Sequence, residues 1–344
     1  MRAWRAHGFG DPEGVLRLDE IDRPDPGPGE LLIRTDAVTL NFNDLDGIHG
    51  RYKTVPVPVP YVPGMEVHGI VVEAGDGADD WVGRTVVAIP AGAFGGYAEY
   101  VIAPAAMAFA MPDDLPLPDA AAIFMPFHLA WLALYERARL ELGETVLIHA
   151  GAGGAGSAAI QLAKLRGAHV VATASTETKR ALCRDLGADV VLDYRTEDVP
   201  GRVSELTDGR GVDVAFDSIG GATTVETFRC MAFGGRHCLV GFASGIEAED
   251  EGIVPRPVLF GNFSLLGVCH AYVEDPIAFR ALTGFNFPAH ADGVEVHDRI
   301  VAHVQAGDLR PVVGLELPFT ELPRGLGAME RRETVGRVVV RVDA

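Results

Sequence analysis

Short apolar runs separated by turn residues fill about the first 120 residues of the chain. The runs LLIRTDAVTL, EVHGIVVEAG and GRTVVAIP are rich in valine, and Gly, Pro or Asp residues stand between them. Runs of this kind are typical of β-strands. Residues 26–30 and 55–60 predict loops, because the alternating prolines of the second stretch cannot lie in a central strand. The pattern predicts a β-rich N-terminal region.

From about residue 125 to residue 268, strands alternate with helices. The apolar strand GETVLIHA precedes a glycine-rich turn and the helical run SAAIQLAKLRGA, and the strands HVVATA, DVVLDY, VDVAFDS, RHCLVGF and NFSLLGV follow. This alternation predicts right-handed βαβ units and an α/β fold with a doubly wound parallel sheet. The last 75 residues or so contain one helical run, HDRIVAHVQAG, and a strand, GRVVVRVD. We expect them to complete the first domain, since they are too few for another.

Composition narrows the classes of function. The 344 residues are 48% hydrophobic, and 48 acidic against 29 basic residues give a net charge of −19. Such a chain repels phosphate backbones, so we expect no nucleic acid partner, and the charge favours solubility. The four cysteines form no CxxC pair, which predicts neither disulfides nor a zinc knuckle and fits a reduced cytoplasmic setting: Cys183, Cys230, Cys238 and Cys269.

No segment predicts a signal peptide or a membrane span. The N-terminus lacks an apolar h-region. The most apolar long run, residues 120–135, contains Pro126 and His128 and is shorter than the roughly 20 residues that a membrane span needs. We therefore expect a core helix there and no membrane partner.

The stretch VLIHAGAGGAGSAAIQLAK contains Gly151, Gly153 and Gly156 as GxGxxG, directly after a strand and at the start of a helix. Glycines in this context let the backbone turn tightly and approach a pyrophosphate, and the helix N-terminus offers free N–H groups. The motif predicts a dinucleotide site. The alternative is a glycine-rich strand-to-helix turn that binds nothing.

The end of the next strand indicates which dinucleotide binds. An NAD site usually has Asp or Glu there for the ribose 2′-hydroxyl, whereas this chain has Thr173, Ala174 and Ser175, followed by Lys179. Ser175 and Lys179 suit a 2′-phosphate, so NADP(H) is favoured over NAD(H). Glu177 is expected in the first turn of the next helix. The alternative for Lys179 is a solvated lysine on the helix surface.

Several segments stand in the order of the markers of a known family: TLNFNDLDGIHGRY, PYVPGMEVHGIVVEAG, GGYAEYV, ETVLIHAGAGGAGSAAIQLAKLRGA, LGADVVLDYRTEDV, GRGVDVAFDSIGG, GGRHCLVGFASG and GRVVV. Through these motifs the chain resembles the medium-chain dehydrogenase/reductase superfamily, in particular its zinc-free quinone oxidoreductase branch. The resemblance implies a GroES-like catalytic domain (1–124 and 269–344) into which a Rossmann domain (125–268) is inserted. It also implies a homodimer through edge strands at 262–268.

The resemblance further implies individual contacts with the cofactor. Gly153, Gly154 and Ala155 would meet the pyrophosphate, and Ser175, Lys179 and Tyr194 would hold the 2′-phosphate. Asn41 would touch the nicotinamide ribose, Arg337 would reach the cofactor, and Tyr52 would steer substrate or relay a proton. The remaining predicted residues would line the path from adenine to nicotinamide: Ser218, Gly241, Phe242 and Ala243.

The chain departs from the family at two positions that matter. Leu129 stands where the family often has Thr near the nicotinamide, and Asp46 stands at a position that is often aromatic or aliphatic. Zinc-dependent relatives have Cys at the position of Asn41 and His at that of Met65, and neither residue here is a good zinc ligand. His68 is three positions from Met65 and should face away from it, so neither His68 nor a lone Glu66 supports a metal site.

Without a Lewis acid, hydride transfer requires an acceptor that is already electrophilic. We therefore expect an enzyme that reduces a quinone or an α,β-unsaturated carbonyl with NADPH, with Tyr52 or solvent as the proton source. His49 and His128 are further candidate donors. The alternatives are an enoyl-thioester reductase of the same fold and a catalytically silent protein that binds NADPH, and Leu129 is the best support for the silent protein.

Overall fold

The structure is a computed structural model that describes residues 1–52, 57–244 and 252–342. The chain forms two compact units, which are described one at a time. The first unit contains residues 1–124, 271–305 and 310–344, and the second contains residues 125–270 and 306–309. Of the loop predicted at 55–60, residues 55 and 56 lie outside the described residues, and residues 57–60 form neither helix nor strand.

The first unit is built on β-sheet. Strands β1 (Arg2–Ala6) and β2 (Leu16–Glu20) form an antiparallel pair, and a seven-stranded sheet has the order β14-β15-β3-β4-β5-β7 with β6 also paired to β3. The strands of this sheet are β3 (Glu30–Thr39), β4 (Val67–Ala74), β5 (Thr85–Ala88), β6 (Tyr100–Pro104), β7 (Ala108–Ala110), β14 (Val313–Pro318) and β15 (Arg337–Arg341).

The C-terminal part of the first unit holds more structure than the sequence predicts. In addition to α10 (His290–Ala306) and β15, it forms α9 (Pro276–Thr283), strand β14 and α11 (Leu322–Glu330). Helix α11 has the sequence LPRGLGAME, in which Pro and Gly conceal the helical pattern. Gly325 is there for packing, because an added Cβ would lie 2.8 Å from Leu40 and 2.9 Å from Leu317. The expectation of one helix and one strand was therefore wrong.

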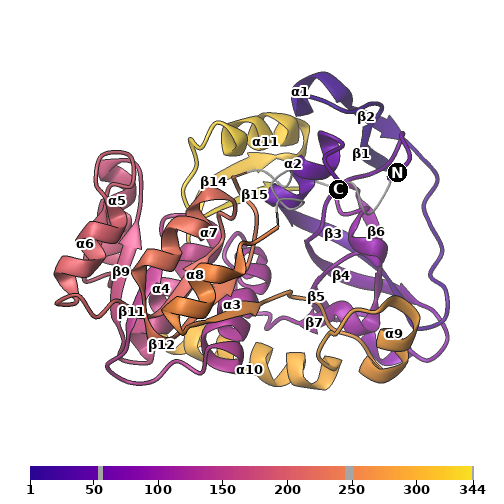
Figure 1. Cartoon of the computed structure of the whole chain (residues 1–344). Coiled ribbons are helices and arrows are strands. Elements are labelled where there is room, and N and C mark those ends of the chain that lie inside the picture. Colours follow the sequence, from indigo (N-terminus) through magenta and orange to yellow (C-terminus); the bar gives the residue numbers. More distant parts are fainter. Residues whose placement is uncertain (53–56, 245–251, 343–344) are drawn as a thin grey trace. The chain divides into compact units, whose positions relative to one another are not determined.

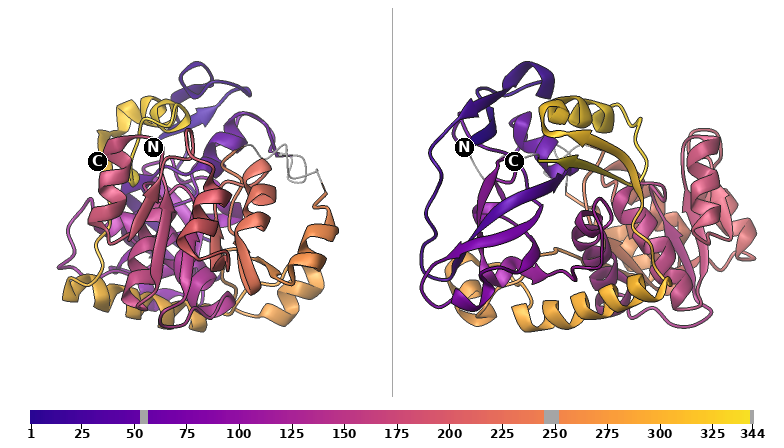
Figure 2. Two further views of the ribbon diagram at one scale, coloured as in Figure 1. Left: turned by 60° about the vertical axis from the view of Figure 1, so that its left-hand side comes forward. Right: turned by 180° about the vertical axis from the view of Figure 1, so that it is seen from behind.

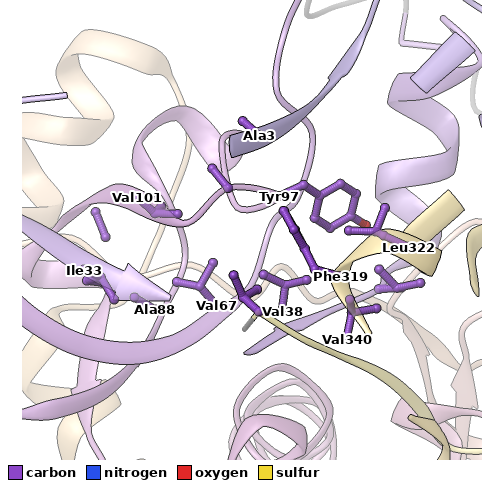
Figure 3. Close-up of a cluster of buried hydrophobic side chains, with 14 of the residues drawn as sticks. Ala3, Ile33, Val38, Val67, Ala88, Tyr97, Val101, Phe319, Leu322 and Val340 are labelled. Carbon is purple, nitrogen blue, oxygen red and sulfur yellow. The ribbon is translucent and has the colours of Figure 1, made fainter. Parts of the chain in front are cut away.

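Alternating side chains of the strands build the core of the first unit. Figure 3 shows this cluster of buried side chains, with Phe319 and Leu322 near the ring of Tyr97, Val38 and Val67 in the middle, and Ile33 at the far end beside Ala88. Burial of each aliphatic side chain contributes roughly 1.5–3 kcal/mol of hydrophobic free energy. This core fixes the ends of β3 and β15, and the short helix α2 (Phe42–Ile48) follows β3 directly.

The second unit is a doubly wound α/β domain, as predicted. Its six strands are parallel in the order β10-β9-β8-β11-β12-β13, and helices lie on both sides of this sheet (Figures 1 and 2). The strands are β8 (Thr145–Ile148), β9 (His169–Thr173), β10 (Val190–Leu192), β11 (Val212–Asp217), β12 (Met231–Leu239) and β13 (Ser264–Gly267). The helices are α3 (Phe124–Trp131), α4 (Gly154–Leu165), α5 (Glu177–Asp185), α6 (Val199–Leu206), α7 (Ala222–Thr227) and α8 (Pro255–Gly261).

Helix α3 passes into a wide π-helical turn at residues 132–137. The N–H of Ala138 donates to the carbonyl of Ala133, five residues earlier, at 2.8 Å. That carbonyl also accepts the thiol of Cys238, with 3.5 Å between Sγ and O. Leu129, the departure noted in the sequence, lies half-buried one turn before this widening.

Candidate functional site

The glycine-rich segment forms the turn between β8 and α4. Ala150 takes a left-handed backbone conformation with φ +49°, and the N–H of Gly153 donates to its carbonyl at 2.9 Å. Gly153 is the N-cap of α4 and has no side chain to satisfy the first N–H groups of the helix. The free N–H groups of this helix end are therefore available to an anionic ligand.

The three motif glycines are needed for different reasons. A Cβ on Gly156 would lie 2.2 Å from the Ala150 carbonyl oxygen, so the turn and the helix could not approach as they do. A Cβ on Gly151 would meet three side chains at 3.0–3.1 Å. At Gly153 the nearest atom would be 3.3 Å away and φ is −81°, which any residue adopts. Packing alone thus requires Gly151 and Gly156 far more than Gly153.

Ser175, Lys179 and Tyr194 lie at one edge of the sheet. Thr173 is paired with Leu192 in the β9–β10 ladder, so Ser175 and Tyr194 each follow the ladder by two residues. Thr176 caps α5, and its hydroxyl accepts the N–H of Lys179 at 3.3 Å. Tyr194 is 42% exposed. The three predicted residues are therefore neighbours on an accessible edge.

Two arginines at this edge were missed by the sequence reasoning. Nη1 of Arg180 donates to Oδ2 of Asp193 at 2.7 Å, and Nε of Arg195 donates to Oδ1 of the same carboxylate at 3.3 Å. Arg180 also pairs with Glu177, which lies in the first turn of α5 as expected. The sequence could have indicated them, because Arg180 directly follows Lys179 and Arg195 directly follows Tyr194. Both arginines are paired with acidic side chains at this edge, so Asp193 and Glu177 offset their charges.

Two loops follow β11 and β12 and contain the other predicted residues. The N–H of Ala243 donates to the Ser218 carbonyl at 3.1 Å, and the N–H of Ser244 donates to that of Ile219 at 2.9 Å. Gly241 and Phe242 lie in the second loop, and Phe242 is 43% exposed. Backbone hydrogen bonds thus hold these two loops together, although they are more than 20 residues apart in sequence.

In the first unit, Asn41 and Arg337 form a buried network with Glu66. Nη1 of Arg337 donates to Oδ1 of Asn41 at 2.9 Å, and Nη2 bonds to the Glu66 carboxylate. Glu66 also accepts the Thr39 hydroxyl, and Nδ2 of Asn41 donates to the Thr39 carbonyl at 3.2 Å. Arg337, the Thr39 carbonyl and the Asp44 backbone N–H fix the orientation of the Asn41 amide, which leaves one N–H for a ligand.

A second buried carboxyl lies beside Asn41. Asp44 is 2% exposed, and its Oδ2 accepts the backbone N–H of Asn41 at 2.9 Å and the Tyr97 hydroxyl at 2.6 Å. Burial raises the pKa of Asp44 to about 7; Glu66 adds to the rise, while Tyr97, the Asn41 N–H and Arg337 oppose it. The acid closes a capping box on α2 and so fixes the backbone of Asn41.

Tyr52 is half-buried, and its hydroxyl donates to the Asn43 carbonyl at 2.9 Å. Its ring meets Phe94 edge-on, and a Cβ on Gly47 would come within 3.3 Å of the Tyr52 ring. Asp46, the other departure noted in the sequence, lies 3.3 Å from Nη1 of Arg51. Tyr52 is therefore held against α2 by its own hydrogen bond.

The two units each assemble part of the predicted set. In the second unit the glycine turn, the basic edge and the two loops all stand at the carboxyl ends of the parallel strands, where open α/β sheets bind ligands. The first unit brings together Asn41 and Arg337, with Tyr52 on the neighbouring helix surface.

Comparison with known proteins gives the lineage of the chain. Two family models match it: "Alcohol dehydrogenase GroES-like domain" at residues 27–113 and "Zinc-binding dehydrogenase" at residues 154–282. A probable quinone oxidoreductase of Schizosaccharomyces pombe is 32% identical over 313 residues, covering 87% of this chain and 93% of that protein. The chain belongs to the quinone oxidoreductase-like branch of the medium-chain dehydrogenase/reductase superfamily.

Other relatives cover nearly the whole chain. The synaptic vesicle membrane protein VAT-1 homolog of Rattus norvegicus is 30% identical over 342 residues, covering 97% of this chain and 82% of that protein. The mycobacterial Rv1454c complexed with NADPH is 32% identical, with a TM-score of 0.86 over 99% of this chain and all of that one. Quinone oxidoreductase of Escherichia coli complexed with NADPH is 27% identical, with a TM-score of 0.85 over 99% and 100%. These superfamily members support both the GroES-like and the Rossmann assignments.

One of the two matched family models is named for zinc binding, but the residues at the corresponding positions of this chain are not suited to bind zinc. Where zinc-dependent relatives have Cys and His, this chain has Asn41, whose amide is bonded to Arg337 and Thr39, and Met65. Glu66 is paired with the Arg337 guanidinium, and His68 lies 4.0 Å from Asp36 instead. In the described part of the chain, no three His, Cys, Asp or Glu side chains cluster as metal ligands.

None of the helices within residues 1–52, 57–244 and 252–342 combines the length and the apolar character that crossing a membrane would require.

Proposed function

We propose that the protein is an oxidoreductase that transfers hydride from NADPH to a quinone or an α,β-unsaturated carbonyl without zinc. The observation that carries the proposal is the edge of the second unit, where a glycine turn opens α4 and where Ser175, Lys179 and Tyr194 follow β9 and β10. Gly153 is conspicuous there, because packing gives it little reason to be glycine. Close approach of a pyrophosphate gives it one.

The proposed cofactor contacts follow from this edge. Gly153, Gly154 and Ala155 hold the pyrophosphate at the N-terminus of α4. Ser175, Lys179 and Tyr194 hold the 2′-phosphate, beside Arg180, whose guanidinium is paired with Asp193 and Glu177. The two joined loops line the path to the nicotinamide with Ser218, Gly241, Phe242 and Ala243. NADPH bound in two similar solved structures supports the choice of NADP(H).

In the first unit we assign Asn41 to the nicotinamide ribose, through the one amide N–H that its internal bonds leave over. Arg337 acts on the cofactor through Asn41, whose amide it orients. When bound, NADPH supplies the hydride. The Tyr52 hydroxyl, or solvent, returns a proton to the reduced acceptor. Because Asn41, Met65 and Glu66 do not form a zinc site, we favour acceptors that need no Lewis acid.

The deciding experiment is oxidation of NADPH by the purified protein with a panel of small quinones and α,β-unsaturated aldehydes and ketones. Turnover with one class and not with saturated ketones supports the proposal. Tight NADPH binding without turnover of any acceptor would instead favour a catalytically silent NADPH-binding protein. Turnover only with enoyl thioesters would favour an enoyl-thioester reductase.

The cofactor assignment has its own test. We expect Lys179→Ala to raise the dissociation constant for NADPH about tenfold or more and to change that for NADH little, because only NADPH has a 2′-phosphate. Lys164→Ala is the matched control, since Lys164 is paired with Asp189 on the far part of α4. Equal effects of Lys179→Ala on both dinucleotides would remove the 2′-phosphate assignment.

We also propose a homodimer through β13. Among the residues that the structure describes, this strand pairs with β12 alone and forms an edge of the sheet. The N–H of Gly234 bonds to the Asn262 carbonyl just before β13, and nearby apolar side chains are exposed: Phe233 (85%), Leu259 (71%) and Phe260 (70%). Light scattering of the wild type should give twice the mass of one chain. The double variant with Leu259→Asp and Phe260→Asp should give the mass of one chain. A monomeric wild type would refute this assembly.

A further inference from the structure

Two threonines of α7 point hydroxyl groups at two different parts of the proposed dinucleotide site. Thr224 and Thr227 are three residues apart and therefore share one face of the helix. The Thr224 hydroxyl donates to the carboxylate of Asp217, and the Thr227 hydroxyl meets Nε2 of His149 at 2.8 Å. Both threonines are buried, at 5% and 1% exposure. This short helix thus contacts the segments that follow β8 and β11.

The hydrogen bonds around His149 run in one direction. The only proton of the Thr227 hydroxyl goes to the Thr223 carbonyl at 2.7 Å, so Thr227 must accept from Nε2–H of His149. Nδ1 of His149 is then an acceptor and receives the Thr173 hydroxyl at 3.4 Å. Thr173 in turn accepts the N–H of Ala150 at 3.3 Å. The chain of bonds ends on the residue whose left-handed conformation begins the glycine turn.

This arrangement requires a neutral imidazole. A protonated His149 would carry N–H groups on both nitrogens, and Nδ1 could no longer accept from Thr173. His149 is 5% exposed, and burial lowers its pKa to about 4, opposed by the nearby Asp217. At neutral pH the ring is therefore uncharged, and Thr227 determines which of its nitrogens holds the proton.

The hydrogen bond from Thr224 leads to a different part of the proposed site, the loop that follows β11. Oδ1 of Asp217 accepts the N–H groups of Ile219 at 2.9 Å and Gly220 at 3.1 Å, and Oδ2 accepts Nε2 of His237 at 3.2 Å in addition to Thr224. These bonds shape the loop that begins at Ser218, and that loop is bonded to the loop of Gly241 to Ala243 through the Ala243 N–H. Thr224 completes the set of donors on Asp217.

We propose that Thr224 and Thr227 are positioning residues that preorganise the dinucleotide site: Thr227 sets the glycine turn through His149, and Thr224 sets the loop after β11 through Asp217. This inference rests on the proposed function, because it needs a dinucleotide to bind at this edge. Neither hydroxyl touches the ligand. Preorganisation removes part of the ordering cost of binding, so its loss weakens affinity.

The experiment replaces each threonine with valine, which keeps the shape and removes the hydroxyl, and with serine, which keeps the hydroxyl. Dissociation constants for NADPH and NADH are measured by the fluorescence of the reduced nicotinamide, and unfolding midpoints by thermal denaturation. We expect Thr224→Val and Thr227→Val each to weaken both dinucleotides about three- to tenfold and equally. Thr224→Ser and Thr227→Ser should bind within about twofold of wild type.

Each outcome decides the question. Equal weakening of NADPH and NADH with rescue by serine supports the proposal and distinguishes it from Lys179→Ala, which acts on NADPH alone. Valine variants with lowered midpoints but unchanged dissociation constants would show a purely structural role and overturn it. Weakening that serine does not rescue would point to shape and also overturn it. If wild type binds neither dinucleotide, the proposed function itself fails; if wild type binds and the valine variants bind equally, only this inference fails.

Discussion

Asp44 and Asp217 are two carboxyl groups buried to the same depth, in different units, whose pKa values shift in opposite directions. Asp44 is 2% exposed and Asp217 is 0% exposed. For both, burial is the largest influence and raises the pKa. At Asp217 the hydrogen bond from His237, the nearby His149 and the Thr224 hydroxyl outweigh it and hold the pKa well below the usual range. At Asp44 burial prevails.

The hydrogen-bond donors account for the difference. Asp217 receives two backbone N–H groups on one oxygen and two side chains on the other. Asp44 receives two donors on Oδ2, and Oδ1 has no hydrogen-bond partner among the residues that the structure describes. A buried carboxylate is stable when both oxygens are satisfied, whereas a half-satisfied one has a raised pKa. Depth alone does not decide the charge.

The largest effect should come from a third buried carboxylate, Glu66, which is paired with the charged guanidinium of Arg337. Arg337→Ala leaves Glu66 without its guanidinium and should lower the free energy of unfolding by about 3–5 kcal/mol. Arg341→Ala on the same strand is the control, because its pair with Glu316 is exposed and should matter by about 0–1 kcal/mol. Urea unfolding measures both. Similar losses in the two variants would contradict the role assigned to the buried pair.

Asp44→Asn tests the half-satisfied site through pH. The folded pKa of Asp44 is about 7 and its ordinary value is 3.8, so wild type should lose stability as pH rises from about 4 to about 7. The loss is at most about 4 kcal/mol. The asparagine variant has no such titration and should gain on wild type across that range. Urea unfolding at pH 5 and pH 8 measures the difference, and parallel pH profiles would refute it.

Asp217→Asn should behave in the opposite way. The amide presents N–H groups to donors that now face a carboxylate, and the free energy of unfolding should fall by about 2–3 kcal/mol. Because the pKa of Asp217 is depressed, its contribution is fully present above the ordinary value of 3.8 and is lost only as pH falls below it. The loss in the variant should therefore be constant from pH 5 to pH 8. A variant more stable than wild type at pH 8 would overturn the comparison.

The smallest effect is expected from Tyr97→Phe. The Tyr97 hydroxyl stabilises ionised Asp44, so its removal should cost about 1 kcal/mol above pH 7 and less at pH 5. It should also move the midpoint of the pH dependence to higher pH, since one force that lowers the pKa of Asp44 is lost. The same urea titrations read out the shift. A midpoint that moved downward would contradict the assigned donor.

Sequence reasoning predicted what local rules determine. The glycine turn, the individual strands and the first turn of α5 with Glu177 depend on residues within about ten positions of one another, where periodicity and capping preferences act. It missed α11, whose Gly325 is there for packing. Arg180 was overlooked beside Lys179, although its charge was visible.

Contacts between distant segments could not be predicted in this way. Arg337 and Glu66 are 271 residues apart, and Asp44 and Tyr97 are 53 apart. No local pattern connects such pairs; only the folded sheet brings them together. The family resemblance supplied Asn41, Tyr52 and Arg337 as candidates, but it did not indicate that the Arg337 guanidinium is bonded to Asn41 and Glu66. The roles of these residues toward a cofactor stay predictions.

The wide turn after α3 has a consequence for chain length. A π-helical turn accommodates one residue more than a regular turn, and here the register it sets lets the Ala133 carbonyl receive both Ala138 and Cys238. Deleting a single residue from 132–137 would convert the wide turn into a regular α-helical turn and remove the five-residue bond to the Ala133 carbonyl. This segment should therefore tolerate the loss of one residue better than the gain of one, and it should tolerate larger side chains least at the fully buried Ala133 and Leu134.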